Sequence, residues 1–136
     1  MARKQAGFSL MELMIVVAIV TILAAIAIPN YVAHVERSNR TDATSALLRL
    51  AADQERYYLQ NNTYGSTTNL GNPTTENGWY TLAITDSSAT SFTATATAKT
   101  GDTQAEDDTC QVFTITSTGL RTATDDGGSD STESCW

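Results

Sequence analysis

Basic side chains are scarce in the C-terminal part of this 136-residue chain. Only two of its eight basic residues, Lys99 and Arg121, lie beyond residue 60, whereas ten of its fifteen acidic residues do. Two basic against ten acidic residues give that part a formal charge of −8. Because so acidic a surface repels phosphate backbones, composition argues against DNA binding. It suits a soluble domain held outside a membrane.

Cysteine and histidine are also scarce, because the chain has two cysteines and one histidine. Cys110 and Cys135 are too few for a structural zinc site, and His34 lies far from both in sequence. An even cysteine count in an exported domain favours one disulfide, the alternative being two unpaired buried thiols. Closing that loop stabilises the domain by ~3.5 kcal/mol in the chain-entropy model.

The sequence has no recognisable nucleophile with its base, no cluster of metal ligands and no phosphate-binding loop. We therefore predict that the protein is not an enzyme and needs no cofactor or metal. Two acidic segments, residues 101–108 and 125–133, contain glycine and could in principle ligate calcium. Neither matches an EF-hand loop, so the sequence leaves calcium binding by these loops open.

One long apolar run is present, from Phe8 to Ile28. As a helix these residues would be about 31 Å long, enough to cross the ~30 Å hydrocarbon core of a bilayer. Arg3 and Lys4 precede the run, so its N-terminus should stay cytoplasmic and the remainder be translocated. Glu12 lies inside it, where a carboxylate costs roughly 2.5–3.5 kcal/mol, which makes this residue a functional hypothesis.

Two alternatives remain for the processing of this run. Ala25-Ile26-Ala27 offers the small-residue site of a secretory signal peptide, which would remove the apolar core. Cleavage after Gly7 would instead keep the core. Glu12 likewise has two explanations, because Ser9 and Glu12 fit an S-x-x-E capping box and Glu12 could also pair with an amine created by cleavage.

Pro29 should weaken the helix without ending it, because it removes the hydrogen bond to the carbonyl of Ala25, roughly 3 kcal/mol in a helix interior. Residues 30–60 contain no glycine or proline and continue as an amphipathic helix. Its predicted buried stripe is Ala43, Ala46, Leu47, Leu50, Tyr57 and Tyr58. Its predicted solvated charges are Arg37, Arg40, Asp42, Arg49, Asp53 and Glu55.

The remainder alternates with period two. After an irregular connection over residues 61–78, strands are predicted at 79–86, 91–99, 111–117 and 120–124. We expect a four-stranded antiparallel sheet with short turns, one face on the helix and the threonine-rich face in water. The fold class is therefore α+β, a long N-terminal helix packed on this sheet, with residues 79–136 including the C-terminal disulfide-bounded region.

The motifs resemble those of the type IV pilin family. Residues 7–13, GFSLMEL, look like the G-F-[ST]-L-x-E-L processing site of type IV prepilins, and a short basic leader and an apolar run flank them. Residues 28–31 (IPNY) and 57–64 (YYLQNNTY) are similar to type IVa pilins. The tyrosine-rich stretch, FTATATAK at 92–99 and the Cys-Trp ending are most similar to the minor pilins that include DNA-uptake receptors.

This resemblance implies a leader over residues 1–7 and a transmembrane and assembly helix over 8–29. Prepilin peptidase would cut between Gly7 and Phe8 and methylate the new amine. Glu12 would pair with that amine during assembly, and Cys110 and Cys135 would bracket the variable region. In a packed filament, residues 21–29 before and at Pro29 would become partly extended.

The implied function is a structural subunit of a type IV pilus, supporting adhesion, twitching motility or DNA uptake. The implied partners are the peptidase, the pilus assembly platform, the membrane, and further copies or other pilins. The protein would lie in the inner membrane with a periplasmic C-terminal domain, and then in the extracellular pilus. Alternatives are a minor tip or DNA-receptor pilin, and a type II secretion pseudopilin. Receptor pilins of this group carry a basic stripe, which this acidic domain lacks.

Overall fold

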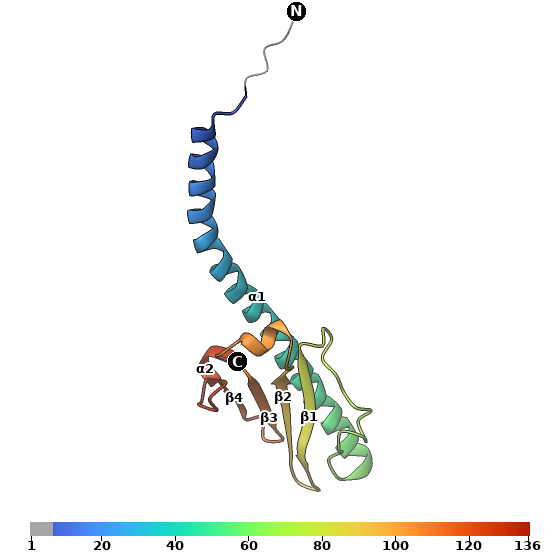
Figure 1. Cartoon of the computed structure of the whole chain (residues 1–136). Coiled ribbons are helices and arrows are strands. Elements are labelled where there is room, and N and C mark those ends of the chain that lie inside the picture. The colour runs from blue at the N-terminus through green and yellow to red at the C-terminus, as the bar shows by residue number, and fades with distance from the viewer. Residues whose placement is uncertain (1–6) are drawn as a thin grey trace, which may run out of the picture. The chain divides into compact units, whose positions relative to one another are not determined.

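The computed structural model describes residues 7–136 (Figure 1). Residues 1–6 of the predicted leader, which include Arg3 and Lys4, lie outside the described residues. The chain divides into two compact units, one ending at Val35 and the other beginning at Glu36. They are described separately below.

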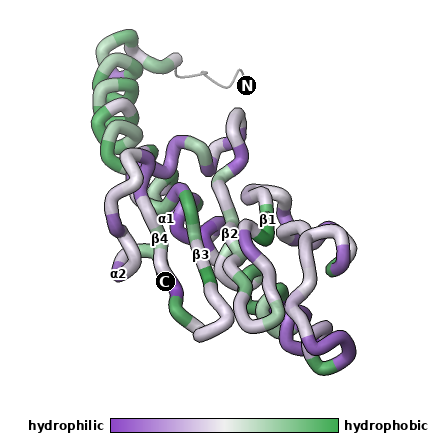
Figure 2. The backbone as a smooth tube through the Cα atoms, turned by 90° about the horizontal axis from the view of Figure 1, so that it is seen from below, coloured by the Kyte–Doolittle hydropathy of each residue, from purple (hydrophilic) through white to green (hydrophobic). Residues whose placement is uncertain are grey.

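The first unit is formed mainly by the N-terminal part of helix α1, whose full extent is Leu10–Asn61. The helix continues through Pro29, as predicted. It is long and apolar enough to cross a membrane by length and composition, and Figure 2 shows the apolar character of its turns. The hydroxyl of Thr21 donates to the carbonyls of Val17 and Ala18, and Asn30 Nδ2 donates to the Ile26 carbonyl at 2.9 Å.

The second unit contains the sheet. Its strands are β1 (Tyr80–Ser87), β2 (Phe92–Ala98), β3 (Val112–Thr116) and β4 (Arg121–Thr124). They pair antiparallel in the order β1-β2-β3-β4, which confirms the predicted sheet (Figure 1). Along β2 the phenylalanine and alanines are buried, while the threonines between them are partly or fully exposed. The period-two pattern therefore assigned the two faces correctly.

The core of the second unit joins the sheet to the C-terminal part of α1. Ala43, Ala46, Leu47 and Leu50 are buried there with a sheet-side set that includes Phe92, Phe113 and Ile115. The first four positions of the predicted stripe are thus correct. Tyr57 and Tyr58 are only half-buried, because α1 ends shortly after them.

Two polar residues of α1 take buried places that the sequence pattern did not predict. Gln54 is fully buried, and its amide donates to the Gly65 carbonyl at 2.7 Å and accepts from the Gly65 N–H at 2.8 Å. Asp42, predicted to be solvated, is 5% exposed, and its Oδ1 accepts from the backbone and side-chain N–H groups of Asn77. Both side chains fix the irregular connection against α1, which satisfies backbone groups that have no strand partner.

The expectation of short turns holds for two of the three connections. Four residues each join β1 to β2 (88–91) and β3 to β4 (117–120). The β2–β3 connection spans residues 99–111 and contains the 3₁₀ helix η1 (Thr103–Glu106), so the prediction is wrong there. This longer connection carries Asp107 to a side chain of α1, as described below.

A disulfide joins Cys110 to Cys135, with their Cα atoms 5.8 Å apart, as predicted. It connects the end of the β2–β3 connection to the short helix α2 (Thr132–Cys135). Trp136 follows, and its indole Nε1 donates to the Thr122 carbonyl of β4 at 2.8 Å. The bridge and this hydrogen bond together hold the C-terminal segment against the edge strand.

Candidate functional site

The predicted processing and assembly residues lie at the beginning of the first unit. Gly7 and Phe8 precede α1, and Phe8 is 83% exposed. A Cβ placed on Gly7 would meet no atom within 4 Å, so this position has room for a side chain. Glu12 lies in the first turn of α1 and is exposed. An amine created on Phe8 by cleavage would therefore lie four residues before a carboxylate in the first turn of α1.

The first turn of α1 is closed by its backbone. The Leu13 N–H donates to the Ser9 carbonyl at 3.1 Å. Within residues 7–136, neither the Ser9 hydroxyl nor the Glu12 carboxylate makes the hydrogen bonds of a capping box. The Glu12 carboxylate is therefore free to bind a group outside its own turn.

The second unit contains a buried ion pair. Arg40 of α1 donates from Nε to Asp107 Oδ2 at 2.7 Å and from Nη2 to Oδ1 at 2.8 Å. The side chains are 14% and 1% exposed, so the prediction that Arg40 is solvated is wrong. The hydrogen bond with Asp107 raises the pKa of the Arg40 guanidinium. Asp107 also accepts from Gln104 Nε2 and from the backbone N–H groups of Thr109 and Cys110.

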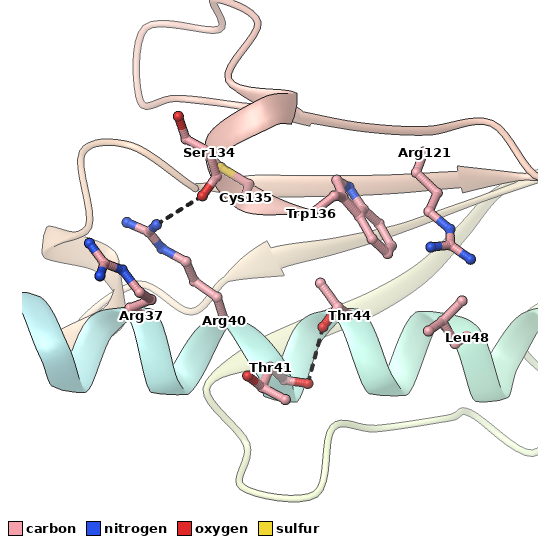
Figure 3. Close-up of a pocket in the computed structure, with 9 residues that line it drawn as sticks. All are labelled: Arg37, Arg40, Thr41, Thr44, Leu48, Arg121, Ser134, Cys135 and Trp136. Atoms are coloured by element: carbon pink, nitrogen blue, oxygen red, sulfur yellow. Dashed lines mark hydrogen bonds between the residues drawn. The ribbon is translucent and has the colours of Figure 1, made fainter.

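A surface pocket of about 330 Å³ lies beside this pair. It is formed by one face of α1, by β4 and by the segment from α2 to Trp136 (Figure 3). We call it the arginine pocket, and its lining residues are Arg37, Arg40, Thr41, Thr44, Leu48, Arg121, Ser134, Cys135 and Trp136.

Two of the three arginines in this pocket are held in place. Arg40 Nη1 donates to the Ser134 carbonyl at 3.3 Å, so the buried pair is also tied to α2. The Arg121 guanidinium lies 5.4 Å from the centre of the Trp136 ring, a cation–π arrangement. Figure 3 places Arg37 and Arg121 toward opposite ends of the pocket, with the Trp136 ring between them. The pocket can therefore bind anionic groups around an aromatic surface.

The sequence motifs identified the processing and assembly residues of the first unit, but they did not identify the arginine pocket. Gly7, Phe8 and Glu12 are neighbours in the chain, so a short motif contains them all. The pocket instead joins residues 37–48 to residues 121–136, which no local pattern connects. The sequence offered two signals, an arginine on the amphipathic helix and a tryptophan at position 136. Neither signal indicated that the two residues lie close together.

Comparison with known proteins agrees with the sequence motifs. A family model described as "Type IV minor pilin ComP, DNA uptake sequence receptor" matches residues 29–114, and one described as "Prokaryotic N-terminal methylation motif" matches residues 2–28. The non-core minor pilin PilV of Neisseria meningitidis is similar in structure, with a TM-score of 0.58 at 26% identity. That similarity covers 71% of this chain and 93% of the PilV chain.

Two further relatives are similar over part of their length. The type IV wide pilus major component PilA4 of Thermus thermophilus is 47% identical over 64 residues, which cover 47% of this chain and 49% of PilA4. The type II secretion system core protein G of Dickeya chrysanthemi is 35% identical over 78 residues, covering 57% and 46%. The chain thus spans about half the length of these two relatives. Because the first family model matches well over half of the chain, this protein belongs to the type IV minor pilin family.

Proposed function

We propose that this chain is a structural subunit of a type IV pilus, assembled through its first helix. The observation that carries the proposal is an exposed apolar helix, long enough to cross a membrane, with one carboxylate in its first turn. Prepilin peptidase cuts between Gly7 and Phe8 and methylates the new amine. The subunit then remains in the inner membrane, with residues 36–136 in the periplasm, until the assembly platform adds it to a filament.

Glu12 determines the register of assembly in this proposal. In a bundle of parallel apolar helices, side chains can slide past one another with little change in burial. The amine of an incoming subunit and Glu12 of the subunit added before it attract by ~4 kcal/mol at ~4 Å and an effective dielectric near 20. Leaving one partner buried and unpaired costs ~3–5 kcal/mol. One step of the helix stack is therefore favoured over all others.

Pro29 supplies an extensible point. The helix is continuous there in the single chain, although the proline cannot donate to the Ala25 carbonyl. In the filament, where other contacts compete, residues 21–29 become partly extended and lengthen the subunit. A filament map with unbroken helix over these residues would contradict this part of the proposal.

The test is the N-terminal mass of the chain in filaments sheared from cells that make it. We expect the mature protein to begin at Phe8 and to carry one methyl group. Gly7→Val is the matched control: it has room for its side chain, so loss of processing would reflect peptidase recognition and not misfolding. A start at Ile28 would support the secretory alternative and overturn the proposal. The share of filament mass that this chain contributes distinguishes a major from a minor subunit.

A second candidate function is DNA reception. Its support is the name of the matching family model and the three arginines of the arginine pocket; the acidic charge of residues 61–136 opposes it. Binding of double-stranded DNA to the detergent-solubilised chain, measured at two salt concentrations, tests it. Binding that weakens steeply with salt and is lost in Arg37→Ala/Arg121→Ala would favour the receptor.

The pseudopilin alternative rests on the similarity to type II secretion core protein G. It predicts that the chain is absent from surface filaments and remains in a periplasmic assembly. The same shearing experiment separates it from the pilus proposal, because a pseudopilin would stay with the cells.

A further inference from the structure

The arginine pocket presents cations that have no counter-ion in the described part of the chain. Arg40 is neutralised by Asp107, whereas Arg37 and Arg121 are exposed and form no ion pair within residues 7–136. The pocket also exposes apolar surface, since Leu48 is 42% exposed and Trp136 is only half-buried. Arginine and tryptophan are among the residues that contribute most to the binding energy of protein–protein interfaces, and here they surround a partly apolar surface.

The same unit presents carboxylates without cations. Glu106 ends η1 and Asp108 follows Asp107; both are exposed and neither forms an ion pair in residues 7–136. Glu36 of α1 lies near them, and burial, together with Asp107, Asp108 and Glu106, raises the pKa of its carboxyl group. We call Glu106 and Asp108 the η1 acidic surface. The nearby guanidinium of Arg40 already forms an ion pair with Asp107.

We propose that the arginine pocket binds the η1 acidic surface of a second copy of this chain, with Arg37 and Arg121 contacting Glu106 and Asp108. The contact deepens the proposed pilus function, on which it rests, by naming a junction between the sheet-bearing units. It joins two different surfaces, so in a pair one copy keeps a free η1 acidic surface and the other keeps a free arginine pocket. Contacts of this kind continue indefinitely when their rotation does not close, as a filament requires.

Charge favours a second copy over nucleic acid as the occupant. Double-stranded DNA carries about one negative charge per 1.7 Å of axis, all of which must be accommodated. Net charge does not separate the two occupants, because a second copy repeats the charge of −8 over its residues 61–136. The local arrangement does, because exposed Glu133 is adjacent to the lining residue Ser134 and would repel a continuous line of phosphates. A second copy brings two carboxylates to two arginines. The polar edge of the pocket then steers the approach, and the surface around Leu48 and Trp136 is covered.

The first test uses charge reversal of the full chain in cells that assemble it. Arg121→Glu and Asp108→Arg should each lower the amount of the chain in sheared filaments by about tenfold or more, because like charges then face each other. The double variant Arg121→Glu/Asp108→Arg should restore at least about half of the wild-type amount, since every copy again presents opposite charges.

The matched control is Arg121→Glu/Asp86→Arg. Asp86 is exposed on β1 and forms no ion pair in the described residues, so this variant restores net charge without restoring the contact. It should stay as low as Arg121→Glu alone. Equal rescue by Asp86→Arg and Asp108→Arg would overturn the proposal, because net charge would then explain the effect.

The second test keeps the charge of the pocket. Arg121→Lys introduces an amine, which a water-soluble carbodiimide couples to a carboxylate only within ion-pair distance. Treated filaments should contain a cross-link from position 121 to Glu106 or Asp108 of another copy, identified by mass spectrometry of the peptides. Cross-links only within one copy, or only to other carboxylates, would overturn the proposal.

The outcomes separate this inference from the pilus function itself. If the wild-type chain is absent from filaments, the pilus function fails first, and the junction falls with it. If the wild type assembles and the single reversals assemble equally well, only the junction is wrong. Loss of DNA binding in Arg37→Glu/Arg121→Glu with wild-type filament amounts would also overturn it, and would assign the pocket to nucleic acid.

Discussion

The two units of this chain differ in how much of their own apolar surface they cover. In the first unit Phe8 is 83% exposed and Ile28 is 63% exposed, and the side chains between them are similar. In the second unit Phe92 and Phe113 are 1% and 0% exposed. Single exposed apolar residues are ordinary, but a continuous exposed helix needs a membrane or a partner to cover it.

The difference extends to charge. In the second unit the buried Asp107 carboxylate has internal partners, since it accepts from Arg40 and from backbone N–H groups. The first unit leaves Glu12 without such partners in the described residues. A unit whose apolar core and buried ion pair are complete within one chain can fold before assembly. A unit whose carboxylate has no internal partner gains its remaining stabilisation from assembly. Substitutions in the first unit should therefore reduce assembly, and substitutions in the second unit should reduce folding stability.

The largest expected effect is loss of assembly without loss of folding. Glu12→Val should insert into the membrane at least as well as the wild type, because it removes a charge that costs roughly 2.5–3.5 kcal/mol there. It should nevertheless be absent from sheared filaments, because the incoming amine then has no partner. The measurement is the amount of chain in the membrane and filament fractions.

Glu12→Gln distinguishes charge from capping. Glutamine can occupy a capping box, so a role in capping alone predicts wild-type quantities of surface filament. The assembly role predicts a loss like that of Glu12→Val. The melting temperature of the second unit should be unchanged in both variants.

In the second unit the largest effect should come from the buried ion pair. Arg40→Ala leaves Asp107 buried without its cation, which typically costs ~3–5 kcal/mol. The control is Arg49→Ala, because Arg49 pairs with Glu76 at 3.5 Å with both side chains exposed; such a pair contributes less than about 1 kcal/mol. Urea unfolding of the detergent-solubilised chain measures both. Equal losses would show that Asp107 is satisfied by its N–H donors alone.

Removing the disulfide should destabilise the second unit by about 2–5 kcal/mol. Cys110→Ser/Cys135→Ser also frees the C-terminal segment, so Trp136 should lose its hydrogen bond to Thr122 and its fluorescence should shift. Reductant should lower the melting temperature of the wild type and leave the double variant unchanged. Titratable thiols in the untreated wild type would contradict the bridge.

Strands β2 and β3 were predictable because their burial has a strict local period. In β2 every second residue is phenylalanine or alanine, and those are the buried ones. The helical stripe was predictable for its apolar members for the same reason. Asp42 and Gln54 were missed because a pattern of apolar residues treats every polar one as exposed. Their burial depends on partners in the loop, Asn77 and Gly65, which helical periodicity does not include.

The site was predictable only where its residues are neighbours in the chain. Arg40 and Asp107 are 67 positions apart, and their pairing depends on the length of the β2–β3 connection. No sequence rule fixes where a 13-residue connection places one carboxylate. The arginine pocket depends on the disulfide as well, because the bridge positions Trp136 beside α1. Its arginines therefore looked like ordinary surface charges.

The smallest expected effect concerns Glu36, beside that ion pair. Burial and then the Asp107 carboxylate raise the pKa of the Glu36 carboxyl group; Asp108 and Glu106 act in the same direction, and the Arg40 guanidinium opposes them. The folded state therefore binds this proton more tightly than the unfolded state does. Above the raised pKa the ionised carboxylate destabilises the fold, and this penalty disappears as the pH falls through that value.

Glu36→Gln should consequently stabilise the second unit at pH 7, by less than about 0.5 kcal/mol because the site is only partly buried. The gain should vanish near pH 4, where the wild-type carboxyl group is protonated in the folded state and largely so in the unfolded state. Urea midpoints at the two pH values measure it. The control Glu76→Gln should shift the midpoint the other way or not at all, because it removes the exposed pair with Arg49. A loss of stability at pH 7 in Glu36→Gln would show that attraction to Arg40 outweighs repulsion from the three acidic neighbours.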